Sequence, residues 1–276
     1  MAGMPVGVST FSYIYSRNAL DTMLHLGGLG FRSFEMVVFP PHVWPTDFGP
    51  SERQEMRSRL ADRDLAIHSL CFPLDDNNLH SMVPEVRRCT IEMYKRVIEL
   101  GNDLRVPYLL VLSGRVHAFF PPPLASLKGW LAEAVAELAP FAAEAGMRLL
   151  LENVPGTMMT TSEDVLDMWT RVGDARIGVN LDMCNAYSAG ERPEEAFRRL
   201  KDHVALVHLA DRGPEHHEKQ PIGTGIVDYA AVGAALTDAG YDGYSMLEIV
   251  TNDRPDEGLL RSRERLAAWG WSDEPA

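Results

Sequence analysis

An ionisable side chain closes each of four apolar runs in the second half of the chain. The runs LLLE, VNLD, VALVH and SMLE end at Glu152, Asp182, His208 and Glu248. A carboxylate in apolar surroundings is costly unless a partner compensates its charge. Each residue alone has an ordinary interpretation as an ion-pair partner, a helix cap or a packed core histidine. Three carboxylates and one imidazole at equivalent positions are better explained by a shared divalent cation.

We therefore expect one divalent metal ion, bound by Glu152, Asp182, His208 and Glu248. Carboxylate oxygens suit Mn²⁺ or Mg²⁺, and the imidazole also admits Co²⁺, Zn²⁺ or Fe²⁺. Mn²⁺ is the expected ion, with Mg²⁺, Co²⁺ and Zn²⁺ as alternatives. The three cysteines have no CxxC spacing, so neither a disulfide framework nor a thiolate metal site is expected.

These four residues need a scaffold that brings four strand ends together. Short β-rich runs alternate with amphipathic stretches along the whole chain. The sequence predicts strands at 6–8, 31–36, 65–71, 106–112, 148–152, 177–182, 204–210 and 244–249. The clearest helical patterns cover 84–101, 130–146, 162–173, 193–201 and 228–240.

Eight strands alternating with about eight helices is the count of a (β/α)8 barrel. An open doubly wound sheet shares this alternation, but it usually carries a glycine-rich turn after its first strand. Here Ser-Thr-Phe-Ser-Tyr follows the first strand instead. We therefore predict an α/β fold made of a single (β/α)8 TIM barrel, with residues 1–276 as one domain. Barrel active sites lie at the C-terminal strand ends, which is where the four ionisable residues are expected.

Composition limits the partners that the protein can have. The chain has 26 Lys and Arg against 39 Asp and Glu, a formal net charge of −13. Such a surface repels phosphate backbones and anionic lipids, so neither nucleic acid nor a membrane is an expected partner. The cysteine pattern favours a reducing compartment, and we identify no signal peptide and no membrane-spanning run. We expect a cytoplasmic protein that acts on a small molecule.

Further candidates lie near the predicted strand ends. His68, near the end of the third strand, is expected either to bind a substrate oxygen or to pack in the core. Glu35, near the end of the second strand, is expected to orient His68 or a substrate hydroxyl, or to cap the next segment. The segment after His208 is expected to close over substrate and supply cations to a phosphate or carboxylate, or else to be solvated surface. Its candidate residues are Asp211, Arg212, His216, His217 and Lys219.

The runs LLENVPG, GVNLDMCNAY, VHLADR with PIGTGIVDY, and YSMLEIV resemble the xylose isomerase-like TIM barrel superfamily, the sugar phosphate isomerase/epimerase family. The group includes ketose 3-epimerases, hydroxypyruvate isomerases, inosose and dehydroshikimate dehydratases, and endonuclease IV. The resemblance implies that Glu152, Asp182, His208 and Glu248 bind the metal and that Glu152 and Glu248 form the acid/base pair. Relatives are often dimers or tetramers, so a homo-oligomer is a further expectation.

Three positions depart from the family pattern. Asn185 stands where the family commonly has a substrate-contacting histidine, and we retain it as a substrate-binding residue. The end of the fourth strand, Ser113–Gly114, lacks the histidine of the multi-zinc endonuclease branch. Met158 replaces a glutamate that ketose 3-epimerases tend to carry, which argues against a free hexulose as substrate.

The expected reaction is proton transfer next to a carbonyl, through an enediolate of a sugar or sugar phosphate. Returning the proton to the other face gives epimerisation, and returning it to the neighbouring carbon gives isomerisation. Loss of a β-hydroxyl from the same intermediate would make the enzyme a dehydratase of inosose or dehydroshikimate type, which is the alternative. A non-catalytic sugar-binding barrel would have a broken ligand set, and an endonuclease would have a basic face, so both are less favoured.

Overall fold

Eight parallel strands close into a ring in the computed structural model, which describes residues 3–73, 76–213 and 219–272. Each strand pairs with its neighbour in sequence, and the eighth pairs with the first, which also pairs with the second. The strands are β1 Met4–Ser9, β2 Ser33–Val37, β3 Ala66–Cys71, β4 Tyr108–Val111, β5 Arg148–Glu152, β6 Gly178–Asp182, β7 Val204–Leu209 and β8 Tyr244–Leu247. A short strand, β9 (Trp271–Ser272), pairs with the beginning of β1 outside the ring. The predicted (β/α)8 barrel is confirmed.

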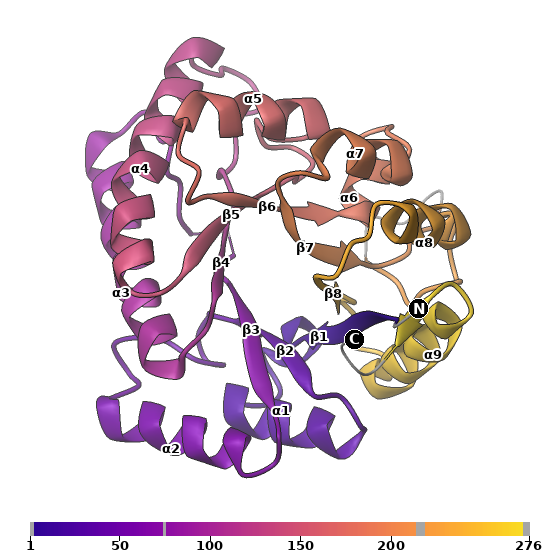
Figure 1. Ribbon diagram of the computed structural model, residues 1–276. Helices are drawn as coiled ribbons and strands as arrows, with labels where there is room; N and C mark the ends of the chain where they lie inside the picture. Colours follow the sequence, from indigo (N-terminus) through magenta and orange to yellow (C-terminus); the bar gives the residue numbers. More distant parts are fainter. Residues whose placement is uncertain (1–2, 74–75, 214–218, 273–276) are drawn as a thin grey trace.

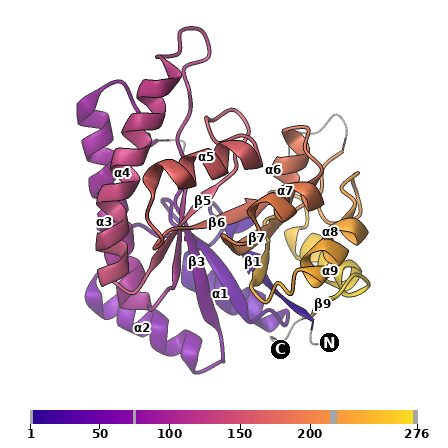
Figure 2. The same cartoon turned by 45° about the horizontal axis from the view of Figure 1, so that its top comes forward.

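Helices surround this ring and connect its strands (Figure 1). They are α1 Ala19–Gly28, α2 Pro50–Ala61, α3 Pro84–Leu104, α4 Leu124–Glu144, α5 Ser162–Val172, α6 Met183–Ser188, α7 Pro193–Leu200, α8 Tyr229–Asp238 and α9 Pro255–Ala267, with a 3-10 turn at Phe11–Tyr13. The two longest, α3 and α4, run side by side along one flank of the barrel (Figure 2). Right-handed connection of parallel strands through helices covers the outer face of the sheet, so the strands are apolar on both faces.

Helix boundaries follow local chemistry. The Thr161 side chain accepts a hydrogen bond from the Asp164 backbone N–H at the start of α5, and Asp228 caps α8 in the same way through Ala231. Such a cap satisfies backbone donors that have no partner inside the helix. Helix α4 begins directly after Pro123, six residues earlier than its apolar pattern indicates.

Two apolar layers fill the structure. The larger lies between the strands and the surrounding helices, and the smaller lies inside the ring. Side chains alternate between these layers along each strand. The inner layer includes Val37, Cys71, Leu110, Leu150, Leu206 and Met246. Because this layer closes the ring below, the ionisable groups at the C-terminal strand ends lie above an apolar floor.

The register of β2 against β3 is irregular at one point that affects the site. Phe34 is opposite Ile67, whereas the next residue, Glu35, is opposite Ser69, so that His68 is skipped. Such a bulge changes which side chains of a strand face the barrel interior. Within the three described segments, no helix combines the length and apolar character that crossing a membrane requires.

Candidate metal centre

Four consecutive strands carry the four predicted ligands to the same end of the barrel. Glu152 and Asp182 are the last residues of β5 and β6, His208 is the last residue but one of β7, and Glu248 directly follows β8. All four are buried, with at most 5% of their surface exposed. Parallel pairing places Asp182 directly opposite His208. The barrel therefore gathers residues that are up to 96 positions apart in sequence.

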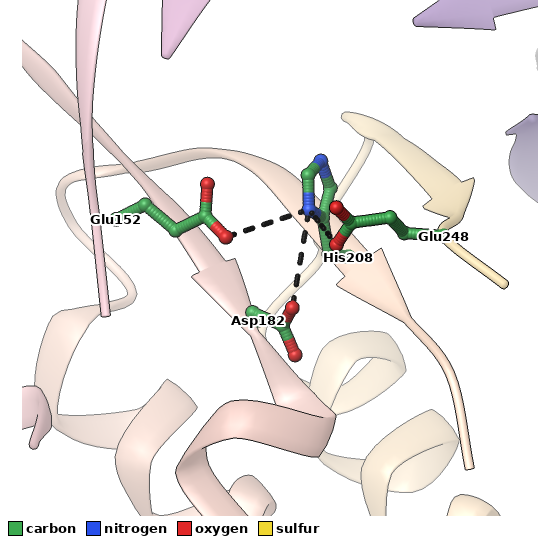
Figure 3. A group of neighbouring side chains, drawn as sticks. All are labelled: Glu152, Asp182, His208 and Glu248. Atoms are coloured by element: carbon green, nitrogen blue, oxygen red, sulfur yellow. Dashed lines mark hydrogen bonds and ion pairs between the residues drawn. The ribbon is translucent and has the colours of Figure 1, made fainter. Parts of the chain in front are cut away.

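The four side chains converge around the imidazole of His208 (Figure 3). Its Nδ1 lies 2.9 Å from a carboxylate oxygen of Glu248, 3.7 Å from one of Glu152 and 4.0 Å from one of Asp182. Glu152 and Glu248 approach from opposite sides (Figure 3). One ligand atom from each residue can be chosen so that all four lie within 4.8 Å of one another.

This arrangement fits a divalent ion. Two ligands on opposite sides of an ion at about 2.0–2.6 Å are about 4–5 Å apart, which matches the observed spread. Glu152 Oε2 is buried and has no hydrogen-bond partner among the described residues, although an unpaired buried carboxylate oxygen is costly. The second oxygen of Asp182 is otherwise used, because Oδ1 accepts from the Asn185 backbone N–H and caps α6. The buried group of three carboxylates and one histidine could hold a divalent metal.

A lysine contributes a positive charge to the same group. The Lys219 ammonium donates to Asp182 Oδ2 and to Glu248 Oε2. Its backbone is held in place because its carbonyl accepts from the Val250 N–H, and the next residue, Gln220, forms a two-way bridge with Asp211. Lys219 therefore partly neutralises the carboxylates that face it.

Burial and neighbouring charges give the two glutamates different proton affinities. Burial raises the pKa of Glu152 to about 8. Burial also disfavours charge on Glu248, but Lys219 and His208 outweigh it and hold the pKa of Glu248 well below its usual value. Two carboxylates whose pKa values are pushed apart are suited to different roles in proton transfer.

Burial raises the pKa of Asp182 as well, against the opposing effect of Lys219. For His208, burial favours the neutral ring. The negative charges of three nearby carboxylates nevertheless raise the pKa of His208 well above its usual value; they belong to Glu35, Glu248 and Glu152. The site thus balances several buried charges, and the proton affinity of each group depends on the others.

A cavity of about 620 Å³ opens over this group. Its lining includes two of the predicted ligands, Glu152 and Glu248. It also includes three residues that the sequence analysis expected to bind substrate, namely Asn185, Arg212 and Lys219. Its wall also includes Phe11, Pro73, Leu112, Val154 and Pro155. A cavity lined by apolar side chains together with a few polar ones is typical of a small-molecule site.

Asn185 and Arg212 are held at the wall by their own contacts. The Asn185 amide donates to the Asn153 carbonyl at 3.0 Å, and the Arg212 guanidinium donates to the Ser188 hydroxyl. His217, with His216, lies outside the described residues. Arg115 also lines the cavity and was not anticipated, although its place just after β4 was a signal that could have identified it.

The carboxylate of Asp211, which was expected to bind substrate, is surrounded by backbone N–H groups instead. It is 1% exposed, and its carboxylate accepts four backbone hydrogen bonds, from Arg212, Gly223, Gly225 and Val227. A carboxylate with this many backbone donors anchors a loop. Asp211 therefore fixes the 219–227 segment that carries Lys219 to the site.

His68 is not at a strand end. It is the third residue of β3, and it is not among the residues that line the cavity. Its ring lies 3.9 Å from that of Tyr244, the first residue of β8 and therefore near the opposite end of the barrel. Burial lowers the pKa of His68 to about 4.

Comparison with known proteins identifies relatives that match half of the chain or more. A family model described as a xylose isomerase-like TIM barrel matches residues 27–269. A fructoselysine 3-epimerase of Shigella flexneri is 28% identical over 228 residues, which cover 81% of this chain and 82% of that protein. An inosose dehydratase of Lacticaseibacillus casei is 23% identical over 158 residues, 50% of this chain and 53% of that protein.

A solved structure described as a D-tagatose 3-epimerase-like protein superimposes on the barrel with a TM-score of 0.84. The alignment covers 96% of this chain and 97% of that chain at 22% identity. At this level of identity the likeness supports the fold.

Proposed function

This chain belongs to the xylose isomerase-like TIM barrel family, and we propose that it is a metal-dependent sugar isomerase or epimerase that transfers a proton next to a carbonyl. The observation that carries the proposal is the convergence of Glu152, Asp182, His208 and Glu248 from four consecutive strands (Figure 3). The similarity to a fructoselysine 3-epimerase over most of both chains supports the same reaction class.

We assign the metal to these four side chains, with Mn²⁺ as the expected ion. A bound divalent ion would polarise the carbonyl of the substrate and stabilise negative charge that develops on its oxygen. The ligand set is oxygen-rich with one imidazole, which suits Mn²⁺, Mg²⁺, Co²⁺ or Zn²⁺.

The two glutamates would move the proton. They lie on opposite sides of the centre (Figure 3), so a sugar bound between them presents one face to each. A carboxylate oxygen of Glu248, which is held ionised by Lys219 and His208, removes the proton from the carbon next to the carbonyl. Glu152, whose pKa is raised by burial, returns a proton from its own oxygen to the opposite face. One proton leaves and one arrives, so the substrate changes only its configuration.

The cavity wall would hold the rest of the substrate. Asn185, Arg212 and Lys219 would supply hydrogen-bond donors, and the apolar part of the lining would exclude water from the reacting carbon. Water exclusion strengthens the electrostatic interactions inside such a site. We place His217 in the same role because it follows the ligand strand, although it lies outside the described residues.

A dehydratase is the second candidate, favoured by the similarity to an inosose dehydratase over half of the chain. It shares the first step, abstraction of the proton next to the carbonyl. The two reactions differ in the next step, because the dehydratase loses a hydroxyl group from the adjacent carbon.

The test combines metal analysis with solvent exchange. The purified protein should contain about one divalent ion per chain, and proton NMR in D₂O should detect deuterium entering ketoses at the carbon next to the carbonyl. A new sugar configuration supports the epimerase, and net loss of water supports the dehydratase. Glu248→Gln should abolish exchange, and Glu144→Gln, a change on the exposed end of α4, is the matched control. Absence of both metal and exchange across ketoses, ketose phosphates and keto-acids would refute the proposal.

A further inference from the structure

A fourth buried carboxylate near His208, that of Glu35, contacts the ring nitrogen that faces away from the other three. Glu35 lies on β2 and is 0% exposed. His208 Nε2 donates to its Oε2 at 2.8 Å, and the Ser69 hydroxyl donates to the same oxygen at 2.8 Å. The interaction joins β2 to β7 through the barrel interior.

The bulge between β2 and β3 makes this geometry. Because the register skips His68, Ser69 rather than its neighbour lies opposite Glu35. The Ser69 hydroxyl then fixes the rotamer of the carboxylate that receives His208. A regular register would place His68 opposite Glu35 and turn Ser69 away from it, since neighbouring residues on a strand point to opposite faces.

The two nitrogens of His208 consequently have different partners. Nε2 faces Glu35, whereas Nδ1 faces Glu248, Glu152 and Asp182. A carboxylate that receives one ring N–H holds the proton on that nitrogen and leaves the lone pair of the other nitrogen directed away from it. In this chain Nδ1 faces the three ligand carboxylates, so an ion bound between them would meet the lone pair of Nδ1.

We infer that Glu35 is a positioning residue for the metal centre: it fixes the orientation and tautomer of His208 so that Nδ1 is presented to the ion, and Ser69 in turn orients Glu35. This inference rests on the proposed function, because it takes the four side chains around Nδ1 as ligands. Glu35 is not itself counted among those ligands, because its Oε2 accepts hydrogen bonds from His208 and Ser69.

The experiment measures Mn²⁺ affinity, by electron paramagnetic resonance titration of metal-stripped protein, for the wild type and a short variant series. Glu35→Leu removes the acceptor, and the dissociation constant should rise about 10–100-fold, as when an outer partner of a metal-bound histidine is lost. Glu35→Gln keeps an acceptor oxygen without the charge, so its dissociation constant for Mn²⁺ should rise by a factor at the low end of that range. Ser69→Ala keeps the Glu35–His208 bond and should weaken binding less than Glu35→Leu. The melting temperature of each metal-free variant shows whether the fold persists.

The outcomes separate this inference from the proposed function. If the wild type binds no Mn²⁺ and His208→Ala changes nothing, the metal centre itself is wrong. If the wild type binds Mn²⁺, His208→Ala abolishes binding and Glu35→Leu binds as tightly as the wild type, only the role of Glu35 is overturned. Should Glu35→Leu fail to fold, Glu35→Gln decides: an unchanged dissociation constant overturns the inference, and a raised constant with an unchanged metal-free melting temperature supports it.

Discussion

Replacing His68 with phenylalanine should make the free energy of unfolding of this protein fall less steeply as the pH is lowered. The ring of His68 lies tilted against that of Tyr244, away from the cavity, and burial lowers the pKa of His68 from 6.5 to about 4. Phenylalanine preserves an aromatic ring at this position and removes the titration.

Acid lowers the free energy of unfolding here because the folded and unfolded chains bind a proton at His68 with different affinity. Between about pH 6.5 and about pH 4 the unfolded chain protonates this histidine and the folded chain does not, so acid favours unfolding. The contribution of the neutral ring is complete above about pH 6.5 and is lost as the pH falls towards 4. With these two pKa values, linkage gives a loss of about 2 kcal/mol between about pH 7.5 and about pH 5.

The assay is urea unfolding of the metal-stripped wild type and His68→Phe at the two pH values. Every other titrating group is shared, so the difference between the two pH slopes isolates His68. The wild type should lose about 2 kcal/mol more than the variant. Equal slopes would show that the ring is protonated as easily in the fold as in the unfolded chain. A raised KM in the variant at neutral pH would show that His68 contacts substrate after all.

Three further predictions concern the site. Glu152→Gln and Glu248→Gln should each lower turnover about 10²–10⁴-fold without loss of the circular dichroism of the barrel, and full activity in either would mean that another group moves the proton. Gly225→Ala would place a methyl carbon 2.3 Å from the carboxylate of Asp211 that anchors the loop, so KM should rise and the melting temperature should fall. Gly129→Ala, inside α4, has no neighbour within 4 Å, so it should leave KM unchanged and should not lower the melting temperature. Lys219→Gln should tighten Mn²⁺ binding in a calorimetric titration, because the ammonium and the ion use the same carboxylate oxygens; weaker or equal binding would contradict this competition.

Local patterns in the sequence were enough to predict the barrel and the composition of the candidate centre. Apolar runs alternate with amphipathic ones along the whole chain, and burial of both strand faces follows from that alternation. Glu152, Asp182, His208 and Glu248 each end an apolar run, and equivalent ends of parallel strands meet on one side of a barrel. The predicted strand ends were correct to within a few residues because strong apolar patterns leave little freedom in where a strand lies.

Contacts between distant segments decided where the other candidate residues lie and which partners they have. His68 was expected near a strand end, but the register of β3 placed it low in the barrel against Tyr244. Asp211 was expected to meet substrate, but folding of the 219–227 segment surrounds its carboxylate with backbone donors. The pairing of Ser69 with Glu35, the carboxylate that receives His208, depends on a bulge that no local pattern marks. Sequence periodicity determines that a residue lies on a strand, whereas its depth in the barrel and its partner across the barrel depend on strand register, which is set only when the ring closes.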